Sequence, residues 1–247
     1  MGLHPIESLS VVVPAYNAAP YIGGTLDSIR DYLGRIGIAH ETIVVDDGSG
    51  DATAAIVERR GGGERLIRLE TNRGKGYAVR QGMLAARYAW SLFTDADNAT
   101  TIDHLERFAP LCGEHDVLMA SRRLRESKVL RRQPRLRQTL GRVFPYLVKM
   151  LVLPQFEDTQ CGFKLFRREA ARDLFGRATI DRFAFDVEVL AIAVGRGWRV
   201  AEVAVDWRNP ESGSTLSIGR DPWSMLRDVV RVAIRSRRGT YRVSGGG

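Results

Sequence analysis

Cysteine and histidine are scarce in this sequence. Among 247 residues there are two cysteines, Cys112 and Cys161, and four histidines scattered along the chain. Two isolated cysteines form neither a disulfide framework nor a zinc cluster, so we expect free thiols and a reducing compartment. The histidines follow no metal-ligand spacing. These absences argue against small disulfide-rich scaffolds and zinc-binding domains.

Long apolar runs and a glycine-rich first loop are also missing. No stretch reaches the roughly 18 apolar residues of a membrane-spanning helix, and the N-terminal residues lack the apolar core of a signal peptide. The loop after the first predicted strand, Pro14-Ala15-Tyr16-Asn17-Ala18-Ala19, contains no glycine. A dinucleotide oxidoreductase needs Gly-x-Gly-x-x-Gly there, and a nucleotidyltransferase resembles glycine-rich-loop proteins at the same place. The loop therefore disfavours both classes.

Basic charge is concentrated in one segment. The chain has 37 Lys and Arg against 29 Asp and Glu, a formal net charge of +8. Residues 122–142 contain nine basic residues and one acid, which equals the whole surplus. Such a segment is either a solvated loop or a surface for phosphates, as in lipid head groups, a phospholipid substrate or nucleic acid. No aromatic residues alternate with the arginines, which weighs against nucleic-acid binding as the main function.

Strands and helices alternate along the chain. Apolar, β-branched segments predict strands, and helical spacing of apolar residues predicts helices between them. This order predicts an α/β fold, with a mostly parallel, Rossmann-like sheet flanked by helices. We expect one domain at 1–215, with a C-terminal basic amphipathic helix and tail at 216–247 packed on it or continuous with it. The predicted strands are 9–13, 42–45, 66–69, 90–94, 117–120 and 200–207, and the predicted helices are 21–32, 52–60, 76–89, 101–111, 136–153, 183–194 and 222–238.

Acidic pairs end two of the predicted strands. Asp46 and Asp47 follow 42–45, and Asp95-Ala96-Asp97 follows 90–94. Ligands of such sheets bind outside the carboxyl ends of the strands. Carboxylates two positions apart project to the same side and offer hard oxygen ligands to Mg²⁺ or Mn²⁺, ions that often bridge carboxylates and substrate phosphates. With the turn Gly74-Lys75-Gly76 between them, the two pairs predict a nucleoside diphosphate site.

Several motifs together resemble the family 2 glycosyltransferases with the GT-A fold, over almost the whole chain. Two further segments, 158–164 and 182–188, resemble dolichyl-phosphate glucosyltransferases and related polyprenyl-phosphate glycosyltransferases. The family tends to have Gly-Ser-Lys where this chain has Gly213-Ser214-Thr215, so another residue is expected to supply one phosphate contact. The matching motifs are the opening strand and loop 9–17, Val45-Asp46-Asp47-Gly48-Ser49, Asn72-Arg73-Gly74-Lys75-Gly76 and Asp95-Ala96-Asp97.

The resemblance implies a nucleoside diphosphate sugar as donor. Asp46 or Asp47 can accept an N–H of the base, and Lys75 can approach the diphosphate. Asp97 would hold the metal, Mg²⁺ or Mn²⁺, and Asp95 would bind ribose or metal. The metal would act as a Lewis acid that offsets charge on the departing diphosphate. The predicted donor-binding residues are Pro14, Tyr16, Asn17, Asp46, Asp47, Lys75, Asp95, Ala96 and Asp97, with Asp95 and Asp97 as metal ligands.

The acceptor implied by the resemblance is a polyprenyl phosphate. A phosphate monoester has a second pKa near about 6, so this nucleophile is largely ionised at neutral pH and needs no strong general base. The predicted catalytic residues are Asp158, Asp186 and Asp95. Asp158 would orient or activate the acceptor, unless it is only a cap or turn residue. The predicted acceptor-phosphate ligands are Arg122, Arg123, Arg131, Lys164 and Ser214, since guanidinium forks match phosphate oxygens.

The motifs, together with what the resemblance implies, predict a metal-dependent, inverting hexosyltransferase that uses UDP-glucose and a polyprenyl phosphate; inversion and glucose come from the resemblance alone. The sugar, UDP against GDP, the acceptor chain length and the oligomeric state stay open. The alternative is a glycosyltransferase that acts on a soluble sugar or a small aglycone. The basic segment and the apolar helix after it predict a peripheral protein, bound to anionic lipids on the cytoplasmic face of the cell membrane.

Overall fold

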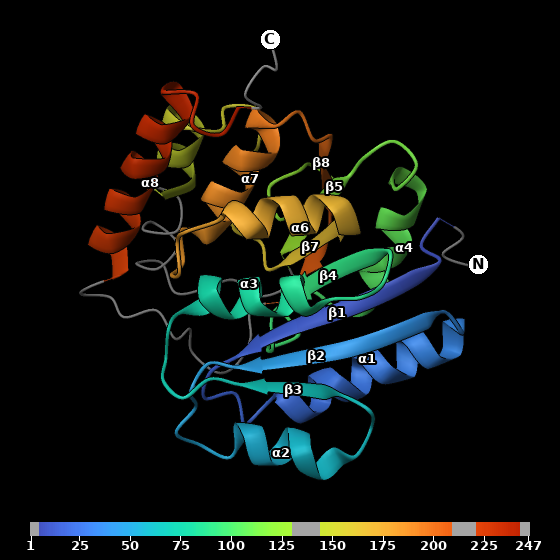
Figure 1. The fold of residues 1–247 in the computed structure, drawn as a ribbon. Helices are drawn as coiled ribbons and strands as arrows, with labels where there is room; N and C mark the ends of the chain where they lie inside the picture. Colours follow the sequence, from blue (N-terminus) through green and yellow to red (C-terminus); the bar gives the residue numbers. More distant parts are fainter. Residues whose placement is uncertain (1–4, 130–143, 209–220, 243–247) are drawn as a thin grey trace.

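A seven-stranded sheet forms the centre of the protein (Figure 1). The structure is a computed structural model that describes residues 5–129, 144–208 and 221–242. The strand order is β3-β2-β1-β4-β7-β5-β8, and neighbours are parallel except where β7 runs antiparallel to β4 and β5. The predicted, mostly parallel sheet is therefore confirmed. The strands are β1 (Ser8–Ala15), β2 (Ala39–Asp46), β3 (Arg65–Arg68), β4 (Trp90–Thr94), β5 (Val117–Ser121), β7 (Phe163–Arg167) and β8 (Val200–Ala204).

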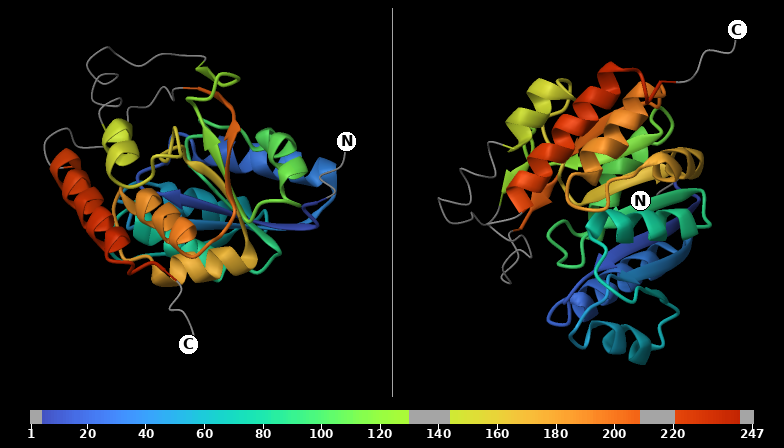
Figure 2. Two further views of the ribbon diagram at one scale, coloured as in Figure 1. Left: turned by 90° about the horizontal axis from the view of Figure 1, so that it is seen from above. Right: turned by 60° about the vertical axis from the view of Figure 1, so that its left-hand side comes forward.

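Helices cover both faces of this sheet (Figure 2). Side chains alternate between the faces along each strand: Val11 and Val13 belong to one buried cluster and Val12 to the other. The cluster with Val12 packs under α3, α6, α7 and α8, and the opposite cluster packs under α1, α2 and α4. The helices are α1 (Ile22–Ile36), α2 (Thr53–Arg60), α3 (Lys75–Ala85), α4 (Leu105–Phe108), α6 (Arg168–Arg177), α7 (Phe185–Gly195) and α8 (Asp221–Arg237).

Some predicted elements differ from the structure. The helix predicted at 76–89 ends at Ala85, because Ala86 has an extended backbone. The helix predicted at 101–111 is three short pieces, with 3₁₀ turns at Ile102–His104 and Ala109–Leu111 around α4. The strand predicted at 200–207 is divided into β8 and β9 (Asp206–Trp207), and β9 pairs with β6 (Lys128–Val129) in a second small sheet. Helix α6 was not predicted.

The C-terminal helix packs on the body of the protein. Residues 185–193 of α7 are all buried, and α8 covers α7 with Val229 and Val232. Of the helix predicted at 136–153, residues 144–153 are described; 144–151 form a helix beside α8, and 152–153 are not helical (Figures 1 and 2). The predicted domain boundary at 215 lies outside the described residues. Cys112 and Cys161 are free and buried. In the part of the chain that the structure describes, no helix is long and apolar enough to cross a membrane.

Candidate active site

The loops that follow β1, β2 and β4 meet at one edge of the sheet. Asp46 ends β2 and pairs in register with Ala15, the last residue of β1. Asp95 directly follows β4. In Figure 1 this edge lies at the left, where the arrowheads of β1 and β2 point. The structure thus brings both predicted acidic pairs to the carboxyl-end edge, where open α/β sheets bind their ligands.

Asp46 and Asp47 have different partners. The two oxygens of Asp47 each accept one backbone N–H at 2.8 Å, from Arg73 and from Gly74. Burial raises the pKa of Asp47, although these two amides oppose the shift. Asp46 Oδ1 accepts the N–H of Ser49 at 3.1 Å. Its buried Oδ2 has Arg68 Nε at 3.8 Å as an ion-pair partner but accepts no hydrogen bond from the described residues. Asp47 therefore fixes the turn before α3, whereas Asp46 keeps an acceptor for a group such as a base N–H.

Hydrogen bonds join the loop after β1 to the loop after β2. Asn17, which has a left-handed φ of 49°, donates its N–H to Ser49 Oγ at 2.9 Å. Its side-chain Oδ1 accepts the N–H of Gly50 at 2.9 Å. Pro14 is buried within β1, and Tyr16 is exposed. Of the three predicted residues here, Asn17 cross-links the loops and Tyr16 has surface that a nucleotide could contact.

The turn before α3 packs tightly against the segment that leads into α7. Gly74 has a φ of 108°, and a Cβ at this position would lie 2.5 Å from the carbonyl oxygen of Asp181. That same carbonyl accepts the N–H of Tyr77 at 3.0 Å, and Arg80 pairs with the Asp181 carboxylate at 2.7 Å. Only glycine tolerates this combination of φ and contact. The N-terminus of α3 is therefore held in place on both sides of Lys75.

The predicted metal motif, Asp95-Ala96-Asp97, forms a compact charged group with Lys75. The Lys75 Nζ lies 2.6 Å from Asp95 Oδ1, and Asp97 Oδ1 accepts the N–H of Ala99 at 3.0 Å. Burial, helped by the charge of Asp95, raises the pKa of Asp97 to about 6. Burial disfavours the charged form of Lys75, but Asp95 and Asp186 outweigh it and raise the pKa of the lysine. The carboxylates of Asp95 and Asp97 and the ammonium of Lys75 thus form one partly buried cluster.

Lys164 is a second cation beside this group, and it is 1% exposed. Its Nζ donates to the carbonyl of Cys161 at 2.7 Å and to Asp186 Oδ1 at 2.6 Å. Burial raises the pKa of Asp186, against the effects of Lys164 and Lys75. Both ammonium groups lie over the ring of Phe93, at 5.5 Å for Lys75 and 5.4 Å for Lys164. The ammonium that we expected on the acceptor phosphate is therefore engaged within the protein, and its phosphate role stays a prediction.

The buried Asp158 and the half-buried Arg122 form a bidentate pair. The guanidinium donates from Nε to Asp158 Oδ2 at 2.6 Å and from Nη2 to Oδ1 at 2.9 Å. The backbone amides of Arg122 and Gln160 complete the set at 3.1 and 3.2 Å. Burial would raise the pKa of Asp158, but Arg122 outweighs it and the pKa is lowered. Asp158 is thus an ionised carboxylate with four donors, and its predicted catalytic role remains to be tested.

The remaining predicted residues have varied positions. Arg123 is exposed. The carbonyl of Ala96 accepts the hydroxyl of Thr25 at 2.6 Å, which attaches the metal motif to α1. Arg131 and Ser214 lie outside the described residues.

The motifs gave no role to three residues that bear on this site. Burial, with the charge of Asp97 as the next cause, raises the pKa of the Tyr21 hydroxyl. The ring of Phe93 lies under the ammonium groups of Lys75 and Lys164. Gly162 lies so close that a Cβ there would be 1.9 Å from Asp95 Oδ2. Gly162 belongs to the 158–164 motif, so the sequence held that signal, whereas Tyr21 has none that spacing reveals.

The acidic pair fits a divalent cation that shares its ligands with substrate. The residues that the structure describes contain no group of three or more His, Cys, Asp or Glu arranged around one ion. Asp95 and Asp97 supply hard oxygens of the kind that Mg²⁺ and Mn²⁺ prefer. Mg²⁺ is commonly held by one or two carboxylates, and the substrate phosphates and water complete its shell. The donor set here matches that pattern.

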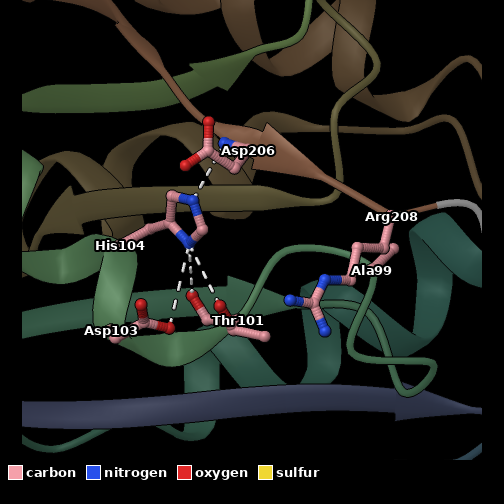
Figure 3. A pocket seen from close by; sticks show the side chains of 6 residues that line it. All are labelled: Ala99, Thr101, Asp103, His104, Asp206 and Arg208. Atoms are coloured by element: carbon pink, nitrogen blue, oxygen red, sulfur yellow. Dashed lines mark hydrogen bonds and ion pairs between the residues drawn. The ribbon is translucent and has the colours of Figure 1, made fainter. Parts of the chain in front are cut away.

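A polar cavity of about 130 Å³ lies beyond the metal motif (Figure 3). His104 stands at its wall: its Nε2 accepts the N–H of Asp206 at 2.9 Å, and its Nδ1 lies 3.0 Å from the carbonyl of Thr101. This pattern fits a neutral imidazole that donates from Nδ1. The N–H of Arg208 bonds the carbonyl of Ala99 at 2.9 Å. These bonds attach β9 to the loop that follows the metal motif.

The sheet and its acidic edge define a class of protein. Glucosyl-3-phosphoglycerate synthase from Mycobacterium tuberculosis, solved in complex with Mn²⁺, UDP-glucose and phosphoglyceric acid, superposes with a TM-score of 0.68. The superposition covers 98% of this chain and 82% of that one, at 20% sequence identity. A likeness at this identity shows the fold alone, which is the GT-A fold of glycosyltransferases.

Sequence comparison identifies the family. The profile of glycosyl transferase family 2 matches residues 10–175. The chain is 37% identical to the dolichyl-phosphate beta-glucosyltransferase of Drosophila melanogaster, over 97% of this chain and 78% of that protein. It is 34% identical to the Homo sapiens enzyme of that name, over 97% of this chain and 79% of that protein. The chain belongs to glycosyl transferase family 2 and is a glycosyltransferase, so the resemblance in the motifs is confirmed.

Proposed function

We propose that the protein transfers glucose from UDP-glucose to a polyprenyl phosphate, with inversion at the anomeric carbon and with Mg²⁺ or Mn²⁺. The curated relatives over nearly the whole chain are named as dolichyl-phosphate glucosyltransferases. The observation that carries the acceptor class is the state of the carboxylates near the metal motif. Asp158 accepts four hydrogen bonds, two of them from a guanidinium, and Asp186 is paired with Lys164.

A carboxylate held as Asp158 is held makes a poor general base. A lowered pKa and a paired guanidinium both make Asp158 a weak proton acceptor. A sugar hydroxyl needs a base to become a nucleophile, but a phosphate monoester is largely ionised at neutral pH. The site therefore favours an acceptor that arrives with its own charge, which a polyprenyl phosphate does and a soluble sugar does not.

The donor side has a place for each part of a nucleoside diphosphate. Asp46 offers the base a buried oxygen that accepts no hydrogen bond from the described residues, and Tyr16, in the loop after β1, is exposed. The N-terminus of α3 directs its positive end towards the same edge, where it favours phosphate groups. Asp95 and Asp97 would hold the divalent ion, which acts as a Lewis acid on the leaving diphosphate when bound. The acceptor oxygen would attack the anomeric carbon as the bond to UDP breaks, and UDP would leave with the electron pair.

We also propose that the protein is peripheral on the cytoplasmic face of the cell membrane, where α8 contacts anionic lipid. The outer side of α8 alternates apolar and basic residues, and Trp223 is 75% exposed. Tyr146 and Met150, on the neighbouring helix 144–151, are exposed as well. A solvated helix does not usually expose a tryptophan with such neighbours, whereas an interfacial helix does. The exposed residues of α8 are Trp223, Arg227, Val230, Arg231, Ile234 and Arg237.

Helix α8 is connected to the donor side by a buried carboxylate. Glu188 of α7 accepts the N–H groups of Thr179 and Ile180 at 2.7 Å, and it pairs with Arg235 of α8 at 3.1 Å. The segment at 178–185 in turn packs on Gly74. A membrane-bound α8 would therefore stay in a fixed position relative to the turn that carries Lys75.

A donor and acceptor screen tests this function. Purified protein is incubated with UDP-glucose or GDP-mannose and Mn²⁺, with a polyprenyl phosphate or with soluble sugars as acceptor. We expect a glucosylated polyprenyl phosphate by mass spectrometry, formed from UDP-glucose and lost in EDTA. Transfer to soluble sugars without transfer to the lipid phosphate would contradict the proposed acceptor and support the alternative one.

A further inference from the structure

The Lys75 ammonium occupies one oxygen of the carboxylate that would bind the metal. Its Nζ lies 2.6 Å from Asp95 Oδ1. The other oxygen, Oδ2, abuts Gly162, where a Cβ would lie 1.9 Å away. We propose that Lys75 competes with the divalent ion for Asp95 and moves to the donor diphosphate when nucleotide and ion bind together. This inference rests on the proposed function, because it assumes a metal-dependent nucleotide donor.

The charges around Asp95 support an exchange of cations. Lys75 and Lys164 face three carboxylates, those of Asp95, Asp97 and Asp186. Full ionisation gives this group a formal charge of −1. A divalent ion alone would raise it to +1 and would place two positive charges beside the ammonium of Lys75. Neighbouring like charges repel strongly where water is partly excluded. The ion would therefore bind most tightly when Lys75 has left Asp95.

Lys75 can leave, whereas Lys164 is fixed. The side chain of Lys75 is 27% exposed, and Asp95 is its one ion-pair partner within 4 Å among the described residues. Lys164 is 1% exposed and has a second bond, to the carbonyl of Cys161. The two ammonium groups lie over the same ring of Phe93, but Lys164 is more buried and has one more bond. Lys75 is therefore the mobile cation of the two.

The diphosphate gives Lys75 its second partner. Lys75 is the first residue of α3, and the positive end of this helix faces the edge where the donor would bind. A diphosphate there would accept the ammonium at the moment when the ion takes its place on Asp95. Metal and nucleotide would then bind with positive coupling. The diphosphate draws Lys75 away from Asp95 and so removes the repulsion that the ion would meet there. The ion in turn frees Lys75 from Asp95 to bind the diphosphate. The lysine would thereby prevent tight metal binding before the donor arrives.

Mn²⁺ binding measured by electron paramagnetic resonance tests the exchange without any turnover. Mn²⁺ is titrated into the wild type, Lys75→Met, Lys75→Arg and Arg73→Gln, each with and without UDP. Arg73→Gln removes a positive charge from the same turn; the Arg73 side chain stacks on Tyr77. We expect Lys75→Met to bind Mn²⁺ alone roughly tenfold more tightly than the wild type, the size of one lost charged hydrogen bond. UDP should enhance Mn²⁺ binding much less in this variant, whereas Lys75→Arg and Arg73→Gln behave as the wild type does.

The outcomes separate this inference from the proposed function. Mn²⁺ binding that is coupled to UDP equally in the wild type and in Lys75→Met would overturn the exchange and leave the metal-dependent function intact. Failure of Mn²⁺ to bind the wild type with or without UDP would overturn the metal-dependent function, and the exchange with it. Circular dichroism establishes first that each variant is folded, and Lys75→Gln replaces Lys75→Met if the latter does not fold.

Discussion

The backbone of Gly162 lies directly against the carboxylate of Asp95. A Cβ at Gly162 would be 1.9 Å from Asp95 Oδ2, and the carbonyl of Gly162 accepts the Asp95 N–H at 3.1 Å. This contact joins the start of the antiparallel strand β7 to the metal motif after β4. Any side chain at position 162 must displace the carboxylate, and the position of Asp95 therefore depends on a residue far away in sequence.

Gly162→Ala should move Asp95 and lower transfer activity at least tenfold, since a displacement of about 1 Å in a catalytic group can cost two orders of magnitude. The change in melting temperature should be small beside this loss. The matched control is Gly176→Ala on α6, where a Cβ meets nothing within 4 Å. Wild-type activity in Gly162→Ala, with Gly176→Ala equally active, would contradict the importance of this contact.

Asp97→Asn should abolish transfer and yet stabilise the fold above pH 6. The folded pKa of Asp97 is about 6, against an ordinary value of 3.8, so folding favours the protonated form. The destabilising effect of Asp97 is absent below pH 4, grows between pH 4 and pH 6, and is constant above. Asparagine can still accept the Ala99 amide without the charge. We expect the free energy of unfolding of Asp97→Asn to exceed that of the wild type by about 1–2 kcal/mol at pH 7.5, and its melting temperature to be higher by roughly 2–6 °C.

Thermal melts of the wild type and of Asp97→Asn at pH 4 and pH 7.5 measure this difference. The gain should be seen at pH 7.5 and should vanish at pH 4. EDTA should abolish the activity of the wild type as Asp97→Asn does, and Mn²⁺ should restore it. Full turnover in EDTA, or an active Asp97→Asn variant, would rule out the metal role of this residue.

Asp46→Asn and Asp47→Asn should both weaken donor binding, for different reasons. Asp46→Asn weakens an acceptor for the base, so UDP affinity should fall about ten- to a hundredfold with little change in stability. Asp47→Asn loses one of the two acceptors that hold the amides of Arg73 and Gly74. It should therefore also lower the free energy of unfolding, by about 1–3 kcal/mol. Calorimetry with UDP and thermal melts measure the two effects, and wild-type affinity in both variants would refute the assignment.

Trp223→Ala combined with Arg227→Ser and Arg231→Ser should weaken binding to anionic vesicles about tenfold or more. Each basic residue near an anionic surface contributes about 1 kcal/mol, and salt screens it. Leu84→Ala on α3 serves as the control for loss of an exposed apolar side chain. Vesicle co-sedimentation at low and high salt measures the binding, which should be weak on neutral vesicles. Equal binding by the triple variant and the control would leave α8 without a membrane role.

The sequence alone predicted the class of fold and the donor side of the site. Strands β1 and β2 are apolar and β-branched, β4 is mostly apolar, and each ends within a residue or two of a polar motif, so local pattern was enough to align their carboxyl ends. Helix α6 could have been found as well, because Ala170, Ala171, Leu174 and Phe175 have helical spacing. The end of α3 at Ala85 could not, since the residues after it are compatible with a helix.

Tertiary structure decided which polar groups are still available to a ligand. Asp46 and Asp47 are adjacent and chemically identical, yet the turn before α3 uses both oxygens of Asp47, whereas one oxygen of Asp46 accepts no hydrogen bond from the described residues. Arg122 with Asp158, and Lys164 with Asp186, meet across 36 and 22 positions of sequence. Spacing shows which residues can reach the edge of the sheet. Hydrogen-bond partners brought from distant segments determine what each carboxylate has left to offer. Lys164, for example, lies on β7 and reaches Asp186 only once β7 is inserted between β4 and β5.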